Sequence, residues 1–455
     1  MLFVSIPQLA MIQDTPYPME WRLDLFSHID VAAIQARLQK ATAPVMLTLR
    51  KTSQGGKFQG TERQREALIE QLLSLHPPFF DLEYDMDPQF LADMIQKHPR
   101  TKFILSIHNF ESTPSDLEGL YSTLQTIPAF CYKIAAKALS TNDALRMLLL
   151  AKKYPKVSVI CMGERGAFAR VLAPLVGNAV NYASLTADTN TGPGQLSMAE
   201  LVDVYHYPRL NKDTAIYGLI GDPVEKSPGH VHHNAVFRAQ SCNAVYVKMQ
   251  VQPEELEEFI PLALALGIQG LSVTIPLKEK IVPWIDEIDP AVAPIGAINT
   301  LRMQNGRIFG TNTDGHGALD AIEKQASVRN KKVVILGAGG AARAIAFEAK
   351  ARGAAVWILN RTVARAQELA KDLGCEAGGL EEVPNAYDVL INCSPDPMPI
   401  TETDIHSGSL VMDIVYTPRE TDFLQAALQK GCQVVYGEEM YLNQAARQTA
   451  YWLSG

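Results

Sequence analysis

Eight short runs of β-branched, aliphatic and aromatic residues recur through roughly the first 200 residues, and segments with helical periodicity lie between most of them. The helical segments include 31–41 and 61–76. This alternation is typical of an α/β fold with a parallel sheet, and eight repeats favour a small (β/α)8 TIM barrel. A doubly wound sheet would show the same alternation, so the strand count alone leaves that fold open. The runs are 2–7, 19–25, 44–50, 79–85, 102–110, 130–136, 156–162 and 178–185.

Charged residues stand at or just past the ends of these runs, where a barrel carries its chemistry. Lys133 lies between Tyr132 and apolar residues, a setting that can lower the pKa of an amine, and His108 ends the preceding run. An activated lysine, a proton-transferring histidine and carboxylate-binding arginines suit a keto acid. Asp24 and Glu83 are equally consistent with a structural role as partners of Arg22 and Arg50. The arginines at or past the ends of the runs are Arg22, Arg50 and Arg170.

Five ordered motifs in this region resemble type I 3-dehydroquinate dehydratase over about residues 1–205: E-W-R-x-D, S-I-H-N-F, Y-K-I-A, M-G-x-x-G-x-x-x-R and P-G-Q. The resemblance implies that Lys133 forms an imine with the C3 ketone of 3-dehydroquinate. It implies that His108 takes the C2 proton and assists water loss and imine hydrolysis. The residues that it assigns to the substrate are Glu20, Arg22, Arg50, Arg170, Thr191 and Gln195.

Two positions depart from the family pattern. Gln54 stands where the family usually has a glutamate near the catalytic histidine, and Thr191 stands where it has a serine. Threonine keeps a hydroxyl. Glutamine keeps a hydrogen bond but loses a charge, so we expect a lower pKa for His108 than in relatives.

A second α/β unit follows the short polar stretch 206–213. Strand-like runs at 214–224, 243–251 and 270–276 and a helical segment at 254–267 predict about 100 residues of mixed structure. Residues past these strands could bind a polyol with one reducible carbonyl, because a lysine can protonate a developing alkoxide and a carboxylate can orient it. Singly, Asn and Asp in such contexts are mostly turn formers. The residues are Thr274, Lys278, Asn299, Thr300, Asn312 and Asp314.

The segment 331–362 reads strand, glycine-rich turn, helix, strand, and its glycines fit the dinucleotide-binding pattern G-x-G-x-x-A. NAD-binding units carry an acidic residue at the end of the second strand, whereas this chain has Arg361, which suits the 2′-phosphate of NADP. An ordinary crossover with surface arginines is the alternative. The residues expected to bind NADP(H) are Gly337, Ala338, Gly339, Gly340, Ala341, Asn360, Arg361, Thr362 and Arg365.

Ordered motifs over about 214–455 resemble shikimate dehydrogenase: G-D-P-V, V-T-I-P-L-K, G-A-I-N-T, T-N-T-D-G, G-A-G-G-A-A-R-A, N-R-T, D-I-V-Y-T-P and Q-A-A. The resemblance implies NADPH-dependent reduction of 3-dehydroshikimate to shikimate, with Lys278 and Asp314 as the catalytic pair. Gly229 replaces a serine of the family, and Glu439 replaces a glycine and is expected near the nicotinamide side. The residues assigned to the substrate are Ser227, Thr274, Asn299, Tyr416 and Gln444.

The two resemblances together predict a bifunctional enzyme in three domains. These are a barrel at 1–208, a substrate-binding domain at 214–316 completed by a C-terminal helix at 438–455, and a Rossmann NADP domain at 317–437. An NAD-dependent quinate/shikimate dehydrogenase and a ligand-sensing regulator with inactive sites are the alternatives.

Composition limits the partners and the location. A net charge of -8 argues against nucleic acid or an anionic membrane as the main partner, which leaves small molecules. Six scattered cysteines without a C-x-x-C pair favour a reducing cytoplasm. The cluster of His230, His232 and His233 lacks a matching set of ligands, so no metal is expected. The oligomeric state stays open.

Overall fold

The computed structural model describes residues 1–12 and 15–454 and separates into two compact units. The first unit consists of Met1–Ile216, His230–Val251 and Glu257–Gly267, and the second of Tyr217–Gly229, Gln252–Leu256 and Ile268–Gly455. This division does not test the limits of the three predicted domains, which stay predictions. Gly455, the last residue of the predicted C-terminal segment, lies outside the described residues.

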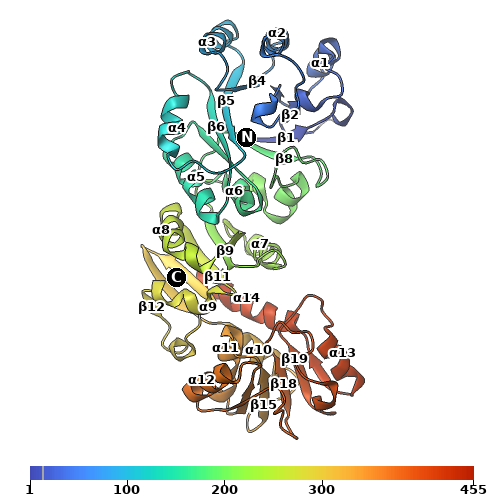
Figure 1. Ribbon diagram of the computed structural model, residues 1–455, viewed down its shortest axis with the longest axis vertical. Helices are drawn as coiled ribbons and strands as arrows, with labels where there is room; N and C mark the ends of the chain where they lie inside the picture. Colours follow the sequence, from blue (N-terminus) through green and yellow to red (C-terminus); the bar gives the residue numbers. More distant parts are fainter. Residues whose placement is uncertain (13–14, 455) are drawn as a thin grey trace. The chain divides into compact units, whose positions relative to one another are not determined.

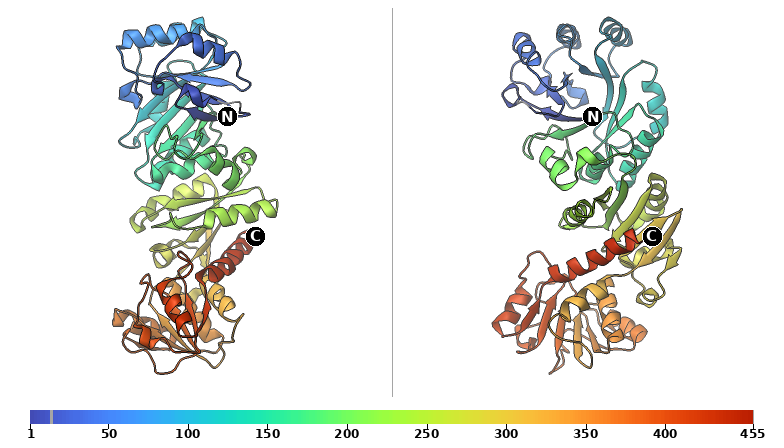
Figure 2. Two further views of the ribbon diagram at one scale, coloured as in Figure 1. Left: turned by 90° about the vertical axis from the view of Figure 1, so that its right-hand side faces the viewer. Right: turned by 180° about the vertical axis from the view of Figure 1, so that it is seen from behind.

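The N-terminal barrel is a sheet of eight strands in the order β7-β6-β5-β4-β3-β2-β1-β8 (Figure 1). Because β1 pairs in parallel with both β2 and β8, the sheet curls into a nearly closed barrel, which confirms the predicted fold and excludes a doubly wound sheet. Figure 2 shows its helices outside the strands. The strands are β1 (Leu2–Ile6), β2 (Met19–Arg22), β3 (Val45–Thr48), β4 (Phe79–Glu83), β5 (Lys102–Asn109), β6 (Cys131–Lys137), β7 (Val157–Met162) and β8 (Asn181–Ser184). The helices are α1 (Val31–Leu38), α2 (Glu62–Leu73), α3 (Pro88–Lys97), α4 (Leu117–Leu124), α5 (Thr141–Lys153) and α6 (Ala167–Leu172).

Local sequence signals explain where these elements begin and end. The Thr61 side chain accepts a hydrogen bond from the backbone of Gln64, whose side chain accepts one from Thr61 in return, and this capping box starts α2. Ser140 and Asp143 start α5 in the same way. Strand β2 is shorter than its predicted run because a 3-10 turn follows at Leu23–Leu25.

The barrel interior is layered, with an apolar floor below a polar site. Residues two apart in a strand face the same side, so an inward apolar residue is followed by an inward polar one nearer the carboxyl end. Phe3 of the floor packs against Phe79 and Tyr182, with ring centroids 5.4 and 6.1 Å away. The apolar and polar members of four strands are Phe3 and Ser5, Met46 and Thr48, Phe79 and Asp81, and Cys131 and Lys133.

A second sheet of six strands is mixed, in the order β10-β9-β11-β13-β14-β12. β13 is antiparallel to both β11 and β14, whereas β12 and β14 are parallel. Its strands are β9 (Ala215–Gly221), β10 (Ala244–Gln250), β11 (Ile268–Val273), β12 (Glu287–Ile288), β13 (Thr300–Gln304) and β14 (Arg307–Thr311). The helices of this region are α7 (Gly229–Ala239), α8 (Leu256–Leu266), α9 (Leu277–Lys280) and α10 (Asp314–Ile322).

The third sheet is parallel and has the order β17-β16-β15-β18-β19-β20, the strand order of a Rossmann fold, as predicted. Alternate residues of β15 enter two different hydrophobic cores: Val333 and Ile335 one, Val334 and Leu336 the other. The sheet is therefore buried on both faces. The strands are β15 (Lys332–Leu336), β16 (Ala355–Leu359), β17 (Glu376–Gly378), β18 (Val389–Asn392), β19 (Leu410–Asp413) and β20 (Gln433–Val435). The helices are α11 (Gly340–Ala351), α12 (Val363–Leu373), α13 (Asp422–Gln429) and α14 (Gly437–Leu453).

Helix α14 returns to the second sheet. Trp452 Nε1 donates to the carbonyl of Leu301 at 2.9 Å, and Gln448 Nε2 donates to the carbonyl of Asn299 at 3.0 Å.

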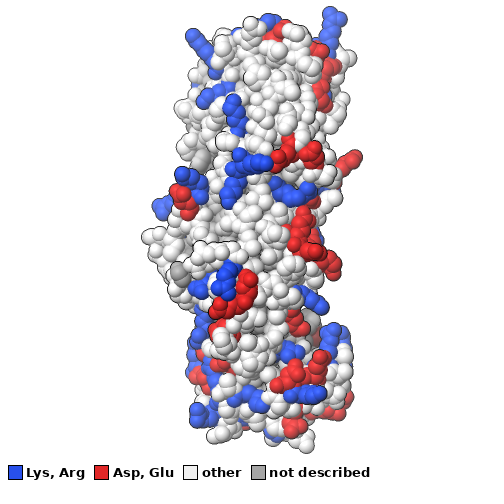
Figure 3. All heavy atoms as spheres, turned by 90° about the vertical axis from the view of Figure 1, so that its left-hand side faces the viewer, with Lys and Arg blue, Asp and Glu red and all other residues white. Residues whose placement is uncertain are grey.

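The face drawn in Figure 3 carries both positive and negative side chains. In the part of the chain that the structure describes, no helix has the length and apolar character needed to cross a bilayer.

Two candidate active sites

One pocket of the barrel brings together all eight side chains predicted for the first site. They come from strands, loops and helix α6, which are distant in sequence but neighbours in the barrel. The predicted residues in this lining are Glu20, Arg22, Arg50, His108, Lys133, Arg170, Thr191 and Gln195, and the further residues include Ser5, Gln54, Phe110 and Tyr182.

Lys133 is buried in β6 and forms an ion pair at the centre of this pocket. Its Nζ lies 2.5 Å from Oδ2 of Asp81 and 4.8 Å from the ring centre of Tyr182. Burial lowers the pKa of Lys133; Asp81 opposes that shift and Arg50 adds to it. Burial alone would raise the pKa of Asp81, but Arg50 and Lys133 outweigh it and lower that pKa to about 2. The amine thus loses its proton more readily than a free lysine, as attack on a carbonyl requires.

Asp81 was not selected from the sequence. The signal that could have found it is the period of two along β4, which puts Asp81 on the same side of the strand as Glu83. Glu83 holds two arginines, with Oε2 2.7 Å from Arg65 Nη1 and Oε1 3.5 Å from Arg50 Nη1. In the same way Asp24 accepts two hydrogen bonds from Arg22, both of 2.9 Å. The structure thus gives Glu83 and Asp24 the role of arginine partners.

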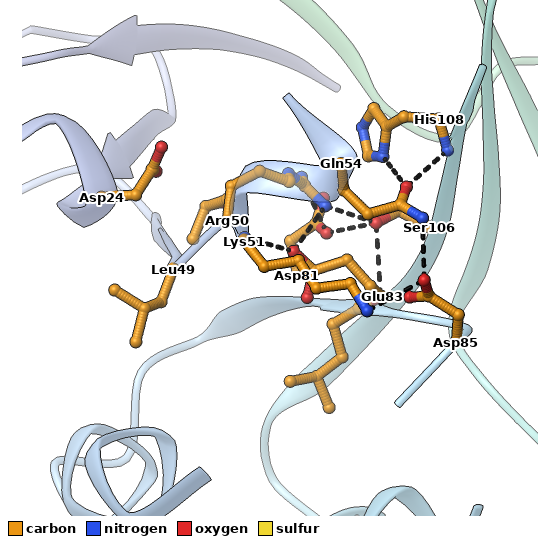
Figure 4. Close-up of polar contacts among 12 residues, drawn as sticks. Asp24, Leu49, Arg50, Lys51, Gln54, Asp81, Glu83, Asp85, Ser106 and His108 are labelled. Atoms are coloured by element: carbon orange, nitrogen blue, oxygen red, sulfur yellow. Dashed lines mark hydrogen bonds and ion pairs between the residues drawn. The ribbon is translucent and has the colours of Figure 1, made fainter. Parts of the chain in front are cut away.

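His108 lies near the end of β5 and contacts Gln54. Its backbone N–H donates to Gln54 Oε1 at 2.8 Å, and its Nδ1 lies 3.1 Å from the same oxygen (Figure 4). The Phe110 ring stacks beside the imidazole at a centroid distance of 6.2 Å. Burial, followed by the charges of Arg50, Lys133 and Arg22, lowers the pKa of His108 well below 6.5.

The lowered pKa of His108 predicts how dehydration responds to acid. A general base must be neutral, and this imidazole is protonated only when the pH falls below 6.5. We therefore expect the acid limb of kcat for dehydration, which reports the complex in which Lys133 is already joined to the substrate, to have its midpoint below pH 6.5. The measurement is a rate profile from acid to neutral pH with full-length protein, and its reference is the reductase rate of the same samples. A midpoint above pH 6.5 would contradict the assignment of His108 as the base.

Arg170 is a buried cation that no carboxylate of the described residues pairs. It lies in α6, its Nη2 donates to the carbonyl of Pro193 at 3.3 Å, and its Nε has no hydrogen-bond partner among the described residues. Burial lowers its pKa to about 10. A buried guanidinium without a counterion is costly, and an anionic substrate group in this pocket would stabilise it.

Replacing Arg170 with alanine is expected to weaken substrate binding more than turnover. Loss of a buried, charge-assisted contact should raise KM for dehydration by roughly 10- to 100-fold. Steady-state kinetics would measure this rise, with Arg63→Ala on the exposed side of α2 as a control. An unchanged KM would show that the substrate carboxylate binds elsewhere.

The loop after β8 closes the pocket beside Glu20. Gln195 Oε1 accepts hydrogen bonds from the backbone and hydroxyl of Thr191, at 2.8 and 3.1 Å, and Gln195 Nε2 donates to Ser5 at 3.3 Å. Ser5 in turn donates to Glu20 at 2.7 Å. The threonine hydroxyl is therefore placed in the site, as expected at a position where the family has serine.

The second candidate site centres on Lys278 in α9. Its Nζ lies 2.5 Å from Oδ2 of Asp314, the first residue of α10. Asn299 Nδ2 donates to Asp314 Oδ1 at 2.8 Å and to Gln444 Oε1 at 3.2 Å. Four predicted residues from different parts of the chain thus form one hydrogen-bonded cluster.

Ser227 and Tyr416 form a second group. Burial raises the pKa of Tyr416, and the side chain of Ser227 opposes that shift. Thr274, just past β11, packs against Gly221, where a Cβ would lie only 2.3 Å from the threonine methyl. Of the two departures in this half, Gly229 opens α7, and Glu439 Oε1 accepts from the backbone N–H of Tyr436 at the start of α14.

The predicted dinucleotide turn lies next to Lys278. Gly337 follows β15 with φ +117, a conformation that favours glycine, and Gly339 has open space where a Cβ would stand. A Cβ on Gly340 would lie 3.2 Å from Cβ of Lys278. Open backbone at the start of α11 fits a pyrophosphate, so NADP(H) would bind beside the lysine. The predicted Ala338 lies in this turn, and Ala341 lies in the first turn of α11. The predicted Asn360, Arg361 and Thr362 follow β16, and Arg365 lies in the first turn of α12.

Two of the three histidines of α7 lie beside tyrosine rings, His230 beside Tyr205 and His233 beside Tyr246. The His233 ring stacks on Tyr246 at 4.5 Å, and burial lowers its pKa to about 3. Among residues 1–12 and 15–454, no group of three or more His, Cys, Asp or Glu side chains is placed to hold a metal ion.

Family models match three successive segments of the chain. They are type I 3-dehydroquinase at residues 8–212, the shikimate dehydrogenase substrate binding domain at 219–301, and shikimate/quinate 5-dehydrogenase at 320–421. Among solved structures, a shikimate dehydrogenase in complex with NADP+ has a TM-score of 0.52 and 38% identity, covering 54% of this chain and 92% of that one. The shikimate dehydrogenase of Aquifex aeolicus has a TM-score of 0.52 and 35% identity, covering 54% and 95%.

Two relatives match nearly the whole chain. The chloroplastic bifunctional 3-dehydroquinate dehydratase/shikimate dehydrogenase of Arabidopsis thaliana is 34% identical and covers 94% of this chain and 76% of its own. The shikimate biosynthesis protein AroDE of Chlamydia pneumoniae is 36% identical and covers 95% and 89%. Since Lys133 and Lys278 lie in the matched segments and both relatives match nearly the whole chain, the chain belongs to the family of bifunctional 3-dehydroquinate dehydratase/shikimate dehydrogenases.

Proposed function

We propose that Lys133 and Lys278 are the reactive centres of this bifunctional shikimate-pathway enzyme. The barrel dehydrates 3-dehydroquinate, and the C-terminal half reduces 3-dehydroshikimate with NADPH. The observation that best supports the assignment is the pairing of each lysine with one carboxylate, Asp81 or Asp314, at 2.5 Å.

In the barrel, neutral Lys133 attacks the C3 ketone, and loss of water gives an imine. The imine acidifies the neighbouring C2–H bond, and His108 removes that proton to form an enamine. The enamine expels the hydroxyl group β to the imine carbon, and His108 returns the proton so that it leaves as water. Hydrolysis of the imine releases 3-dehydroshikimate and restores the lysine. Asp81 balances the positive charge of Lys133 when the amine is protonated, since its carboxylate lies 2.5 Å away.

Substrate binding in the barrel follows from the charges around the pocket. The guanidinium of Arg170, which no carboxylate of the described residues pairs, would receive the carboxylate of the substrate. Glu20, Gln195 and Thr191 would bind its hydroxyls. Arg22 and Arg50 pair with Asp24 and Asp81 and also line the pocket, where they would contribute to substrate binding. Their positive charges also lower the pKa of His108 and so favour its neutral form.

In the second site, Lys278 would donate a proton to the oxygen of the carbonyl as it becomes an alkoxide. Asp314 holds the lysine, Asn299 donates to Asp314, and Gln444 adds an amide group from α14. NADPH, when bound, supplies the hydride. The turn at Gly337–Ala341 would bind its pyrophosphate, and Asn360–Thr362 with Arg365 would surround the 2′-phosphate.

The choice of cofactor is tested at Arg361. Arg361→Ser removes a cation that can pair with the 2′-phosphate of NADPH but has no counterpart in NADH. We expect the ratio of kcat/KM with NADPH to kcat/KM with NADH to fall roughly tenfold or more. Arg329→Ser, at an exposed arginine before β15, is the matched control. If the ratio does not change, the preference for NADPH over NADH would depend on Arg365 or Asn360 instead of Arg361.

One coupled assay tests both activities together. Full-length protein is given 3-dehydroquinate and NADPH, and the loss of NADPH absorbance is followed. Oxidation of NADPH with shikimate as the product requires both sites to work in turn, whereas direct reduction of 3-dehydroquinate would give quinate, so the product is identified by chromatography. Oxidation with 3-dehydroshikimate but not with 3-dehydroquinate would contradict a working dehydratase, and tight binding of both compounds without turnover would support a sensor.

We also propose a cytoplasmic location. All six cysteines are free thiols, as suits a reducing compartment. The Arabidopsis relative is named chloroplastic, and microscopy of the tagged full-length protein would distinguish the two.

A further inference from the structure

Gln54 connects His108 to a carboxylate that does not itself reach the histidine. Its Oε1 faces the backbone N–H and Nδ1 of His108, and its Nε2 donates to Asp85 Oδ2 at 3.1 Å (Figure 4). Gln54 is 8% exposed and lies in a short turn after β3, whereas Asp85 lies just after β4. The same oxygen of Asp85 pairs with Lys51, whose Nζ lies 2.9 Å from Oδ2.

The hydrogen bonds of this group leave only one orientation for the Gln54 amide. The backbone N–H of His108 can only donate, so it requires the amide oxygen. The carboxylate of Asp85 can only accept, so it requires the amide nitrogen. A flipped amide would lose both contacts.

The same reasoning fixes the proton on the imidazole. With the amide oxygen 3.1 Å from Nδ1, that nitrogen must carry the hydrogen. The lone pair of neutral His108 is therefore on Nε2, and Nε2 is the atom that can accept a proton from a substrate.

We propose that Asp85 is a positioning residue for dehydration: through Gln54 it holds His108 in the Nδ1–H tautomer, so that Nε2 is the base. This inference rests on the proposed role of His108 in the barrel reaction. In this arrangement the neutral amide of Gln54 contacts the histidine, and the carboxylate of Asp85 contacts the far end of that amide.

The pairing explains how the chain works with glutamine at position 54. A glutamate there would place its carboxylate at about 3.1 Å from that of Asp85, where the two negative charges would repel. With glutamine, the charged groups that act on His108 are three cations, and no carboxylate among the described residues hydrogen-bonds to its ring. The cations are Arg22, Arg50 and Lys133.

Two variants of Asp85 separate its hydrogen bond from its charge. Asp85→Asn retains an oxygen that can accept from Gln54, whereas Asp85→Leu has no acceptor. In full-length protein labelled with 15N-histidine, we expect the spectra of the parent and of Asp85→Asn to show the Nδ1–H tautomer of His108. We expect Asp85→Leu to show a mixture of both tautomers. The His108 signals are assigned from their loss in His108→Gln, and no substrate is needed.

The kinetic expectation follows the tautomer. Asp85→Leu should lower kcat for dehydration about tenfold with little change in KM, while Asp85→Asn stays close to the parent. The reductase activity of the same chain serves as a control for intact protein. The double variant Gln54→Glu with Asp85→Asn removes the repulsion and should recover activity relative to Gln54→Glu alone.

Three results would overturn the inference: an Nε2–H tautomer in the parent, an unchanged tautomer and kcat in Asp85→Leu, or no recovery in the double variant. If Asp85→Leu does not fold, the inference is tested by comparing the dehydratase activity of Gln54→Glu with that of the double variant Gln54→Glu, Asp85→Asn. A parent protein with the Nδ1–H tautomer but no dehydratase activity would contradict the proposed function alone.

Discussion

Lys133→Ala is expected to abolish dehydration of 3-dehydroquinate and to leave the reduction of 3-dehydroshikimate intact. Without the amine no imine forms, so kcat for dehydration should fall on the order of 10⁴-fold or more. Separate assays of the two reactions on purified full-length protein would measure this. Lys137→Ala, at the exposed end of the same strand, is the matched control and should keep both activities.

Chemical trapping tests imine formation at Lys133 without any measurement of reaction rates. Borohydride added to the parent protein with 3-dehydroquinate should reduce the imine to a stable adduct, and peptide mass spectrometry should locate that adduct on Lys133. An adduct on another lysine, or loss of both activities in Lys133→Ala, would rule out the assignment of one lysine to one reaction.

Lys278→Ala is expected to give the reverse pattern. Removing the proton donor should lower kcat for reduction by about 10²- to 10⁴-fold, because the alkoxide then forms without general-acid assistance. Dehydration by Lys133 should continue at its normal rate. NADPH oxidation with 3-dehydroshikimate gives the readout, and Lys280→Ala, exposed in the same short helix, is the control.

The coupled assay distinguishes Lys278→Ala from a general loss of structure. With 3-dehydroquinate the variant should accumulate 3-dehydroshikimate, detected directly by its absorbance, while NADPH is not consumed. If the variant still reduces 3-dehydroshikimate at the parent rate, the proton donor must be a group other than Lys278.

The parts of the structure that could be predicted from the sequence are those that depend on local pattern. Strand and helix periods predicted the barrel, and the glycine turn predicted the strand and helix around Gly337. The predicted limits were less accurate, as at β2, because a 3-10 turn continues the same apolar pattern. Two-residue strand β12 has too little pattern to be recognised.

The contacts within the sites depend on register and could not be predicted. Asp81 and Lys133 lie two strands apart, and only the pairing of β4, β5 and β6 brings them together. Gln54 and Asp85 lie in loops after neighbouring strands, so no spacing in the sequence shows that they touch. The residue types at a barrel end could be identified from the sequence, whereas the partners of each could not.

The position of Gln444 on α14 sets an order in which the two sites are completed during protein synthesis. Every residue of the barrel pocket, up to Gln195, is translated before the second sheet begins at Ala215. The Lys278 cluster, in contrast, waits for Gln444. At about 5–20 residues per second, the interval is on the order of ten seconds or more. A nascent chain can therefore contain every residue of the dehydratase pocket while its reductase site still lacks Gln444.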